Sequence, residues 1–127
     1  MLKQTFLINT NLKMDKGKIV VQVSHGTVMY MEKVTGLDAD AWMQERYITW
    51  RAETPEDPIG MMKKVVLKST ENEMRDIFNK LKSQDIWAYL IFDKGLTQVP
   101  ENSLTCLVVE PLEESQCNIL FGNLKLL

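Results

Sequence analysis

The feature that most constrains the fold is an alternation of short apolar runs with longer segments that suit helices. The four apolar runs have the length and composition of buried strands and lie at 5–8, 64–68, 86–92 and 104–109. Proline-free segments predict helices from 17 to about 34, from Asp38 or Asp40 to about 50, and from about 70, with a short helix at 113–120. Such alternation predicts an α/β fold whose first strands run parallel.

The last two runs are joined by only ten residues, Asp93–Asn102. A helical crossover does not fit in a link of that length, so the final strand is expected to be antiparallel. We therefore expect a three-layer α/β/α fold with a mixed, mostly parallel four-stranded sheet. A chain of 127 residues is expected to form a single domain, 1–127.

The segment from Thr70 allows a firm local prediction, and the segment from 17 needs a choice between helix and strand. Thr70 followed by Glu73 has the spacing of a capping box, and an apolar stripe follows at Met74, Ile77, Phe78 and Leu81. The segment from 17 is ambiguous because its β-branched residues also suit a strand. Its length and lack of alternation favour a helix that is buried on most of its surface. The two prolines within 53–58 should interrupt regular structure.

Composition excludes several classes of protein. Apolar residues make up 45% and charged residues 25%, which is typical of a globular domain. No apolar run has the length of a membrane helix, and the N-terminus lacks the layout of a signal peptide, so a cytoplasmic protein is expected. The net charge of −2 implies no affinity for nucleic acid over the whole surface.

Positive charge is concentrated in two segments, 1–18 and 60–68, each with a local charge of +3. Folding could bring them together into one positive site, or they could be ordinary solvated lysines. Cysteine and histidine indicate no metal site. Cys106 lies in an apolar run where a buried thiol is expected, and its spacing from Cys117 fits neither a redox pair nor zinc.

Polar residues at two places are candidates for chemistry. Lys18, Gln22 and His25 share one helix face, which should look into a cleft or onto solvent. The link that begins at Asp93 follows a strand, where open α/β sheets usually bind ligands. Gly95 suits a turn with positive φ, although Asp93 and Thr97 are also common turn residues.

Four segments, taken in order along the chain, resemble the archaeal and eukaryotic type of peptidyl-tRNA hydrolase, type two. Segment 12–25, LKMDKGKIVVQVSH, is similar to the N-terminal motif of that family, and 63–68, KKVVLK, to its second strand. Segment 93–100, DKGLTQVP, with Thr105 beyond it, resembles the family's Asp-x-Gly-x-Thr-Gln motif and following threonine. The ending GNLKL at 122–126 resembles its terminal Gly-x-Leu-Lys-Leu.

The chain departs from the family pattern at Asn9, Asn11 and Leu96, and segment 26–62 is longer than usual. Asn9 and Asn11 stand where the family commonly has Arg and Asp, and Leu96 replaces a residue that is often basic. Two of these changes remove positive charge, so they bear on RNA affinity more than on the chemistry.

The resemblance implies a cytoplasmic hydrolase that acts in translation and cleaves the ester between peptide and tRNA in peptidyl-tRNA. It implies attack by a positioned water without metal or cofactor, a three-layer fold and, as in many family members, a homodimer. The catalytic residues that it implies are Lys18, Asp93, Thr97 and Thr105. Those implied for substrate binding are Lys16, Gln22, His25, Gly95, Gln98, Lys63 and Lys64.

Within this resemblance, Asp93 is expected to orient the water or hold Lys18, and Lys18 to offset charge on the oxyanion or a phosphate. Thr97 and Thr105 would supply hydroxyl donors. Two rival interpretations remain: an inactive family member that binds RNA or protein, and a hydrolase acting on another acyl ester.

Overall fold

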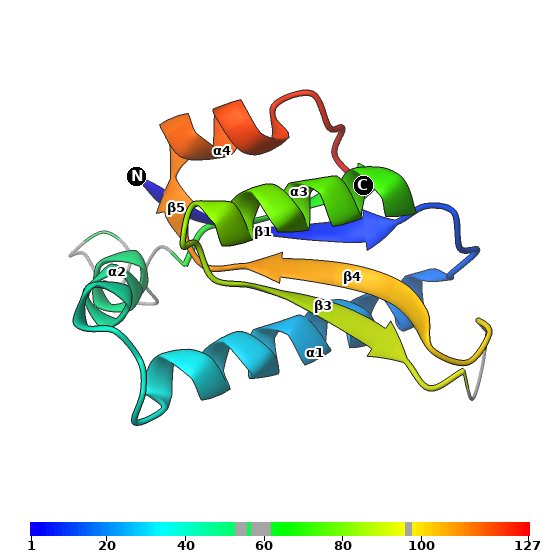
Figure 1. The fold of residues 1–127 in the computed structure, drawn as a ribbon, viewed down its shortest axis with the longest axis horizontal. Coiled ribbons are helices and arrows are strands. Elements are labelled where there is room, and N and C mark those ends of the chain that lie inside the picture. The colour runs from blue at the N-terminus through cyan, green and yellow to red at the C-terminus, as the bar shows by residue number, and fades with distance from the viewer. Residues whose placement is uncertain (53–55, 57–61, 96–97) are drawn as a thin grey trace.

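The computed structural model describes residues 1–52, 56, 62–95 and 98–127. Along the chain the elements are β1 (Leu2–Asn9), α1 (Lys16–Thr35), α2 (Ala41–Arg51), β2 (Lys64–Ser69), α3 (Glu71–Ser83), β3 (Ala88–Asp93), β4 (Ser103–Val109), β5 (Leu112–Glu113) and α4 (Glu114–Phe121). The predicted order of the longer elements is confirmed (Figure 1). Most of the proline-containing segment 53–58 lies outside the described residues.

The strands form one open mixed sheet in the order β2-β1-β4-β3, with β5 paired to β1. β1 and β2 are parallel, whereas β4 is antiparallel to both of its neighbours, β1 and β3. The prediction of an antiparallel final strand after Asp93 is thus confirmed. Because β4 lies between β1 and β3, three strands point the same way although most neighbouring pairs are antiparallel. The two-residue strand β5 was not predicted.

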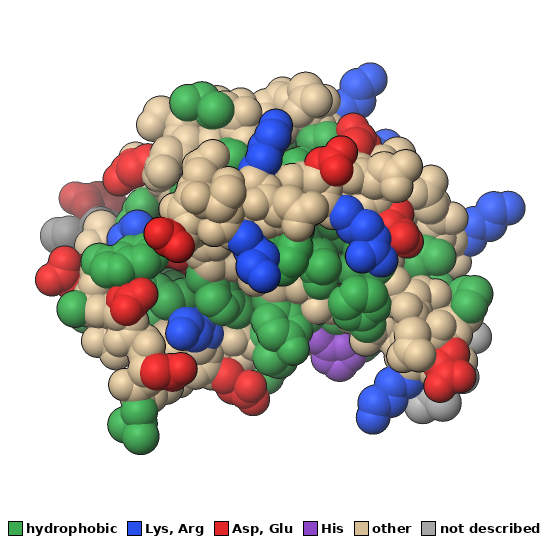
Figure 2. Space-filling model, in the orientation of Figure 1, with side chains coloured by type: hydrophobic (Ala, Val, Ile, Leu, Met, Phe, Trp, Pro, Cys, Tyr) green, Lys and Arg blue, Asp and Glu red, His purple; other side chains and the backbone are tan. Residues whose placement is uncertain are grey.

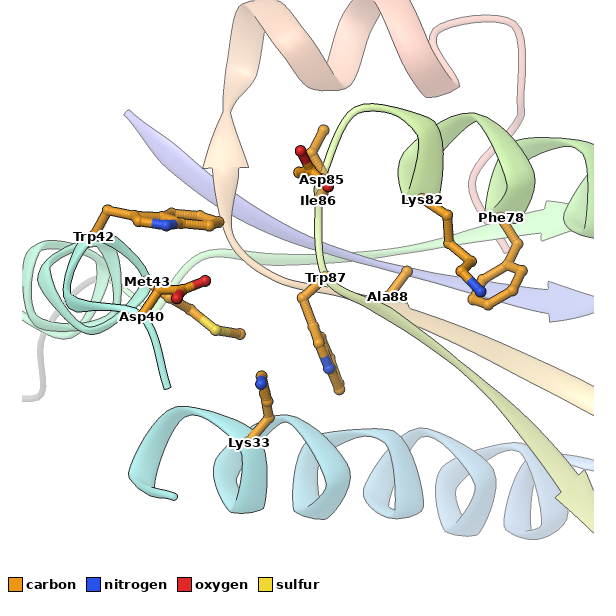
Figure 3. Close-up of a pocket in the computed structure, with 10 residues that line it drawn as sticks. All are labelled: Lys33, Asp40, Trp42, Met43, Phe78, Lys82, Asp85, Ile86, Trp87 and Ala88. Atoms are coloured by element: carbon orange, nitrogen blue, oxygen red, sulfur yellow. The ribbon is translucent and has the colours of Figure 1, made fainter. Parts of the chain in front are cut away.

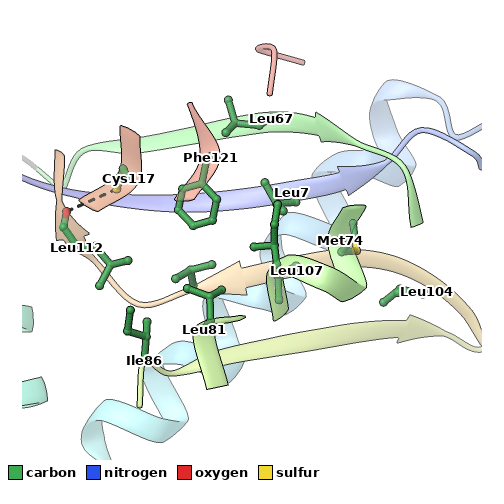
Figure 4. Packing of buried hydrophobic residues seen from close by; sticks show 12 residues of the cluster. Leu7, Leu67, Met74, Leu81, Ile86, Leu104, Leu107, Leu112, Cys117 and Phe121 are labelled. Atoms are coloured by element: carbon green, nitrogen blue, oxygen red, sulfur yellow. Dashed lines mark hydrogen bonds between the residues drawn. The ribbon is translucent and has the colours of Figure 1, made fainter. Parts of the chain in front are cut away.

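Helices cover both faces of the sheet, which confirms the three layers. On one face α3 and α4 enclose a core that includes Leu7, Met74, Leu107 and Phe121 (Figure 4). On the other face, α1 and α2 pack against side chains of β1 and β4. Cys106 is buried in this second core, as predicted, and burial raises the pKa of its thiol to about 12.

α3 begins and packs as its sequence predicts. The Thr70 side chain accepts a hydrogen bond from the backbone of Glu73, and the Glu73 carboxylate accepts one from the backbone of Thr70. Met74, Ile77 and Leu81 are buried, while Phe78 is half-buried against the same core. The capping box and the apolar stripe are both confirmed.

The prediction that α1 is buried on most of its surface is wrong. Its fully buried residues are Gln22, Gly26, Tyr30 and Val34, which repeat every four residues along one stripe. Val20 is 64% exposed, because α1 is an outer layer that touches the sheet along a single line. At that line a Cβ on Gly26 would lie 3.0 Å from Cβ of Val108, so glycine permits the close approach of helix and strand.

The strand directions bring several polar residues together at one end of the sheet, where three of the strands terminate. β1, β2 and β3 end there at Asn9, Ser69 and Asp93, and β4 starts there at Ser103. The N-terminus of α1 lies at the same end of the sheet, since the Lys18 side chain contacts Asp93. This end of the sheet holds the candidate site.

Candidate active site

An ion pair between Lys18 and Asp93 forms the centre of the site. Nζ of Lys18 donates a hydrogen bond to Oδ1 of Asp93 at 2.7 Å, across 75 residues of sequence. Each side chain is only 11% exposed, so the pair is largely shielded from water but still accessible at one side. The structure thus joins the two segments that sequence analysis singled out separately.

A chain of hydrogen bonds from buried side chains holds the Asp93 carboxylate in place. Nε2 of Gln22 donates to Oδ1 of Asp93 at 3.2 Å, and the Thr105 hydroxyl donates to Oε1 of Gln22 at 2.6 Å. Gln22 and Thr105 are fully buried. Since Thr105 donates to the amide oxygen, it leaves the amide nitrogen of Gln22 facing Asp93. The stripe Lys18–Gln22 therefore faces the site, not bulk solvent.

The loop after β3 supplies the second side of the carboxylate. The backbone N–H of Gly95 donates to Oδ2 of Asp93 at 2.6 Å. Gly95 has a φ of +75°, as its place in a turn predicts, and a Cβ there would lie 2.4 Å from the backbone nitrogen of Glu101. Glycine is therefore needed both for the backbone conformation and for the close approach of the chain.

These donors keep Asp93 ionised. The hydrogen bond from Lys18 is the main reason that the pKa of the Asp93 carboxyl lies below its usual value, and the bonds from Gly95 and Gln22 lower it further. A carboxylate with a lowered pKa is a weak base at neutral pH, because it binds a proton poorly. The geometry suits a fixed negative charge that orients other groups.

Gln98 fastens the loop to the start of α1. Its Oε1 accepts from the backbone N–H of Asp15 at 3.0 Å, and its Nε2 donates to the Asp15 carboxylate. Asp15 in turn caps α1 by accepting from the backbone N–H of Lys18 at 2.9 Å. Asp15 was not predicted as a site residue, although aspartate directly before a helix is the signal of a cap.

The remaining residues implied by the resemblance are spread more widely. Lys16 is exposed on the first turn of α1, and His25 is exposed two turns after Lys18. Thr97 lies outside the described residues, as does Leu96. No described contact tests their assignment to catalysis or binding, so these assignments stay predictions.

Lys63 and Lys64 are not brought to this site. β2 is parallel to β1 and starts at Lys64, so both lysines lie at the opposite end of the sheet, roughly 17–20 Å away by strand length. Lys63 forms an ion pair with Glu114, and Nζ of Lys64 lies 4.9 Å from the centre of the Trp50 ring. Folding therefore does not bring Lys63 and Lys64 to Asp93.

The asparagines that depart from the family pattern have structural partners. Asn9 is fully buried, and its Nδ2 donates to the carbonyl of Leu104 at 2.8 Å. Oδ1 of Asn11 accepts from the backbone N–H of Glu71, the first residue of α3. These bonds tie the end of β1 to β4 and α3, a role that the sequence did not reveal.

Within residues 1–52, 56, 62–95 and 98–127, no group of three or more His, Cys, Asp or Glu side chains is placed to hold a metal ion. In the same residues, no helix is long and apolar enough to span a bilayer.

Comparison with known proteins agrees with the resemblance. The family model for peptidyl-tRNA hydrolase PTH2 matches residues 2–127. A peptidyl-tRNA hydrolase of Thermococcus sibiricus is 34% identical over 98% of this chain and 96% of its own. The enzyme of Methanothermobacter thermautotrophicus is 29% identical over 99% of this chain and the whole of its own.

The fold also resembles a solved structure of a protein of unknown function from Agrobacterium tumefaciens strain C58. That structure has a TM-score of 0.58 at 12% identity, and the match covers 99% of this chain and 97% of that one. The shared architecture is that of an α/β protein, and open α/β sheets usually bind ligands at the strand ends, where the polar residues after β3 lie. This chain belongs to the PTH2 family of peptidyl-tRNA hydrolases.

Proposed function

We propose that the chain hydrolyses the ester that joins a peptide to the ribose of tRNA, and that the Lys18–Asp93 pair is the centre of catalysis. The observation that carries this proposal is the largely buried ion pair held by Gln22 and Gly95. The resemblance implies catalysis by the same lysine and aspartate. Family membership and the names of the relatives support the substrate.

The reaction adds water to the ester carbonyl and then expels the ribose hydroxyl. The carbonyl oxygen becomes negatively charged in the transition state, and the positive charge of Lys18 stabilises it there. The water supplies the second oxygen of the peptide carboxylate and the proton that restores the ribose hydroxyl of tRNA, and its other proton is released to the solvent. Asp93 holds Lys18 in place and orients the attacking water; its lowered pKa argues against proton abstraction as its main role.

Gln22 and Thr105 act as positioning residues in this scheme. Thr105 is fully buried, so its hydroxyl fixes the amide of Gln22, and that amide fixes Asp93. The resemblance implies that Thr97 is catalytic, and we assign it the role of a hydroxyl donor.

Purified protein incubated with peptidyl-tRNA and, separately, with aminoacyl-tRNA tests the function directly. We expect release of free peptide and tRNA from the first substrate, and little release from the second. Tight tRNA binding without hydrolysis would favour the RNA-binding module instead. Equal hydrolysis of unrelated acyl esters would favour a hydrolase of another specificity.

Hydrolysis should survive treatment with EDTA. Both oxygens of Asp93 already accept hydrogen bonds, from Lys18 and Gln22 at one and from Gly95 at the other, so the carboxylate is poorly placed to ligate a metal. We expect the same rate before and after dialysis against the chelator. Loss of activity that zinc or magnesium restores would contradict this mechanism.

The logarithm of the affinity for tRNA should fall linearly with the logarithm of the salt concentration, because lysines near the site would neutralise phosphates. Lys16 and Lys94 are exposed beside the site, so the double variant Lys16→Ala/Lys94→Ala should flatten the slope by about 0.7 to 0.9 for each lost contact. Filter binding over a salt series measures this.

The matched double variant Lys63→Ala/Lys64→Ala tests the prediction made from sequence for the far end of the sheet. A flattened slope there would mean that tRNA also crosses that end. An unchanged slope with normal affinity would place Lys63 and Lys64 off the RNA path.

We further propose a cytoplasmic location and a homodimer for this protein, as the resemblance implies. Sedimentation equilibrium tests the assembly. A mass of about twice the 14.7 kDa chain supports a dimer, and the monomer mass contradicts it.

A further inference from the structure

The outer edge of β3 has no neighbouring strand among the described residues. In the sheet order β2-β1-β4-β3, this strand is the last, and it is paired on one side only. Exposed edge strands offer a row of backbone donors and acceptors to another extended chain. β3 is therefore a possible template for strand addition.

The register shows which backbone groups face outward. The backbone N–H of Glu110 donates to the carbonyl of Trp87 at 3.1 Å, and Tyr89 pairs with Val108 two residues further along. In an antiparallel pair, alternate residues bond to the partner. Ala88 and Leu90 therefore turn their N–H and C=O groups away from β4, toward the open edge.

Two hollows lie along this edge, and one of them has mostly apolar walls. The hollow nearer to Asp93 has a volume of about 370 Å³ and lies between α1 and β3. It is lined by His25, Val28, Met29 and residues 89–92. Val28, Tyr89 and Phe92 are 53%, 41% and 49% exposed. Figure 2 shows apolar side chains gathered across the middle of this face, with the single histidine of the chain at their lower border.

The second hollow, of about 540 Å³, lies at the start of β3 (Figure 3). Trp87, directly before β3, points toward α1, and Trp42 and Met43 line the side formed by α2. The charged side chains at its walls, Lys33, Lys82, Asp40 and Asp85, balance one another. A surface that mixes apolar side chains with balanced charges carries no net positive charge for phosphates and suits a peptide.

The edge leads directly to the site. β3 ends at Asp93, so Leu90 is three residues, or about 10 Å, from the catalytic carboxylate. In peptidyl-tRNA the reacting carbonyl is the C-terminal carbonyl of the peptide. The bound peptide must therefore extend from the site along a surface of the protein. The peptide residues next to the reacting carbonyl lie within reach of the outer edge of β3.

We propose that the peptide part of the substrate binds as an added strand on the outer edge of β3, parallel to it, with its C-terminal carbonyl at Asp93. This inference rests on the proposed function and deepens it. The outward groups of Ala88 and Leu90 bond to the peptide backbone, and apolar side chains of the peptide enter the hollow beside Val28 and Tyr89. Recognition through the backbone does not depend on the side chains of the peptide.

A test compares substrates that differ only in the peptide. N-acetyl-aminoacyl-tRNA is too short to follow β3, whereas an apolar tetrapeptidyl-tRNA spans it. We expect kcat/KM to be about 10-fold higher for the tetrapeptidyl substrate, since two added backbone hydrogen bonds stabilise it. N-methylation of the peptide nitrogens facing β3 should remove most of that advantage.

One double variant and one single control variant test the side chains that line the hollow between α1 and β3. Val28→Gln/Tyr89→Gln removes two apolar walls, and Ile119→Gln is the control, since Ile119 is 86% exposed on α4 at the other face of the sheet. We expect the first to bring the ratio of the two kcat/KM values toward 1 and the second to leave it at the parent ratio. Thermal melting confirms that both proteins are folded.

The outcomes separate this inference from the function. Equal kcat/KM for both substrates in the parent protein would overturn strand addition and leave the hydrolase intact. Hydrolysis of neither substrate would overturn both. A parent dimer that Val28→Gln/Tyr89→Gln splits into monomers would overturn the inference, because a second copy would then cover this edge.

Discussion

Asp93→Asn is expected to lower the rate of peptidyl-tRNA hydrolysis by on the order of 10² or more, the scale that follows the loss of one group that organises the charge around the transition state. Asn has the same size but no charge, so Lys18 loses its charged partner. Asp93 also accepts from three donors, at both of its oxygens. The amide of Asn has only one accepting atom, so at least one of these donors loses its bond. Single-turnover hydrolysis measures the loss.

Binding of tRNA by the same variant should hold or tighten, because a negative charge near phosphates is removed. This separates a catalytic loss from a binding loss. Asp76→Asn, on an exposed position of α3, is the matched control and should leave both measurements unchanged. If folded Asp93→Asn protein turns over at nearly the parent rate, Asp93 is a turn residue and not part of the mechanism.

The fold was predictable wherever local signals and burial agree. The capping box at Thr70 and the short link after Asp93 gave the start of α3 and the antiparallel last strand, because each depends on a few neighbouring residues. β5 was missed because two residues carry no periodicity. The burial of α1 was overestimated because β-branched residues such as Val20 remain exposed on an outer helix.

The site was predictable in its members and in part of its connections. Residue spacing placed Lys18 and Gln22 on one helix face, and the resemblance led us to expect that Asp93 orients the water or holds Lys18. The fold shows the bond between Asp93 and Lys18 and adds the bond from Gln22. The separation of Lys63 from the site depends on strand direction, which local charge does not report. The role of Asn9 was also not predictable, because a buried amide that bonds to the backbone of β4 leaves no signal in the sequence.

Lys18→Met should also lower the rate by on the order of 10², because it removes the positive charge that stabilises the oxyanion. Met preserves much of the length of the side chain, so packing changes little. The hydrogen bond from Lys18 is the main reason for the low pKa of Asp93, so that pKa should rise in the variant. The acid limb of the pH–rate profile that belongs to Asp93 should therefore move to higher pH. Lys80→Met, exposed on α3, is the control and should leave the profile unchanged.

Stability should follow the same linkage. In the parent, the low pKa of Asp93 contributes stability that is present above the unfolded value of about 3.9 and is lost as the pH falls through the folded value. Lys18→Met should therefore melt at a lower temperature than the parent at pH 7, and the gap should close in acid. A gap that stays constant with pH would mean that the variant loses packing and not the ion pair.

The double variant Lys18→Met/Asp93→Asn decides whether the two residues act as one unit. If Asp93 works by holding Lys18, the double variant should lose on the order of 10² in rate, little more than either single variant. Independent roles would multiply the losses to on the order of 10⁴. Such a product would mean that Asp93 acts on the water without Lys18, and that the 2.7 Å contact between them is not how the carboxylate contributes to the rate.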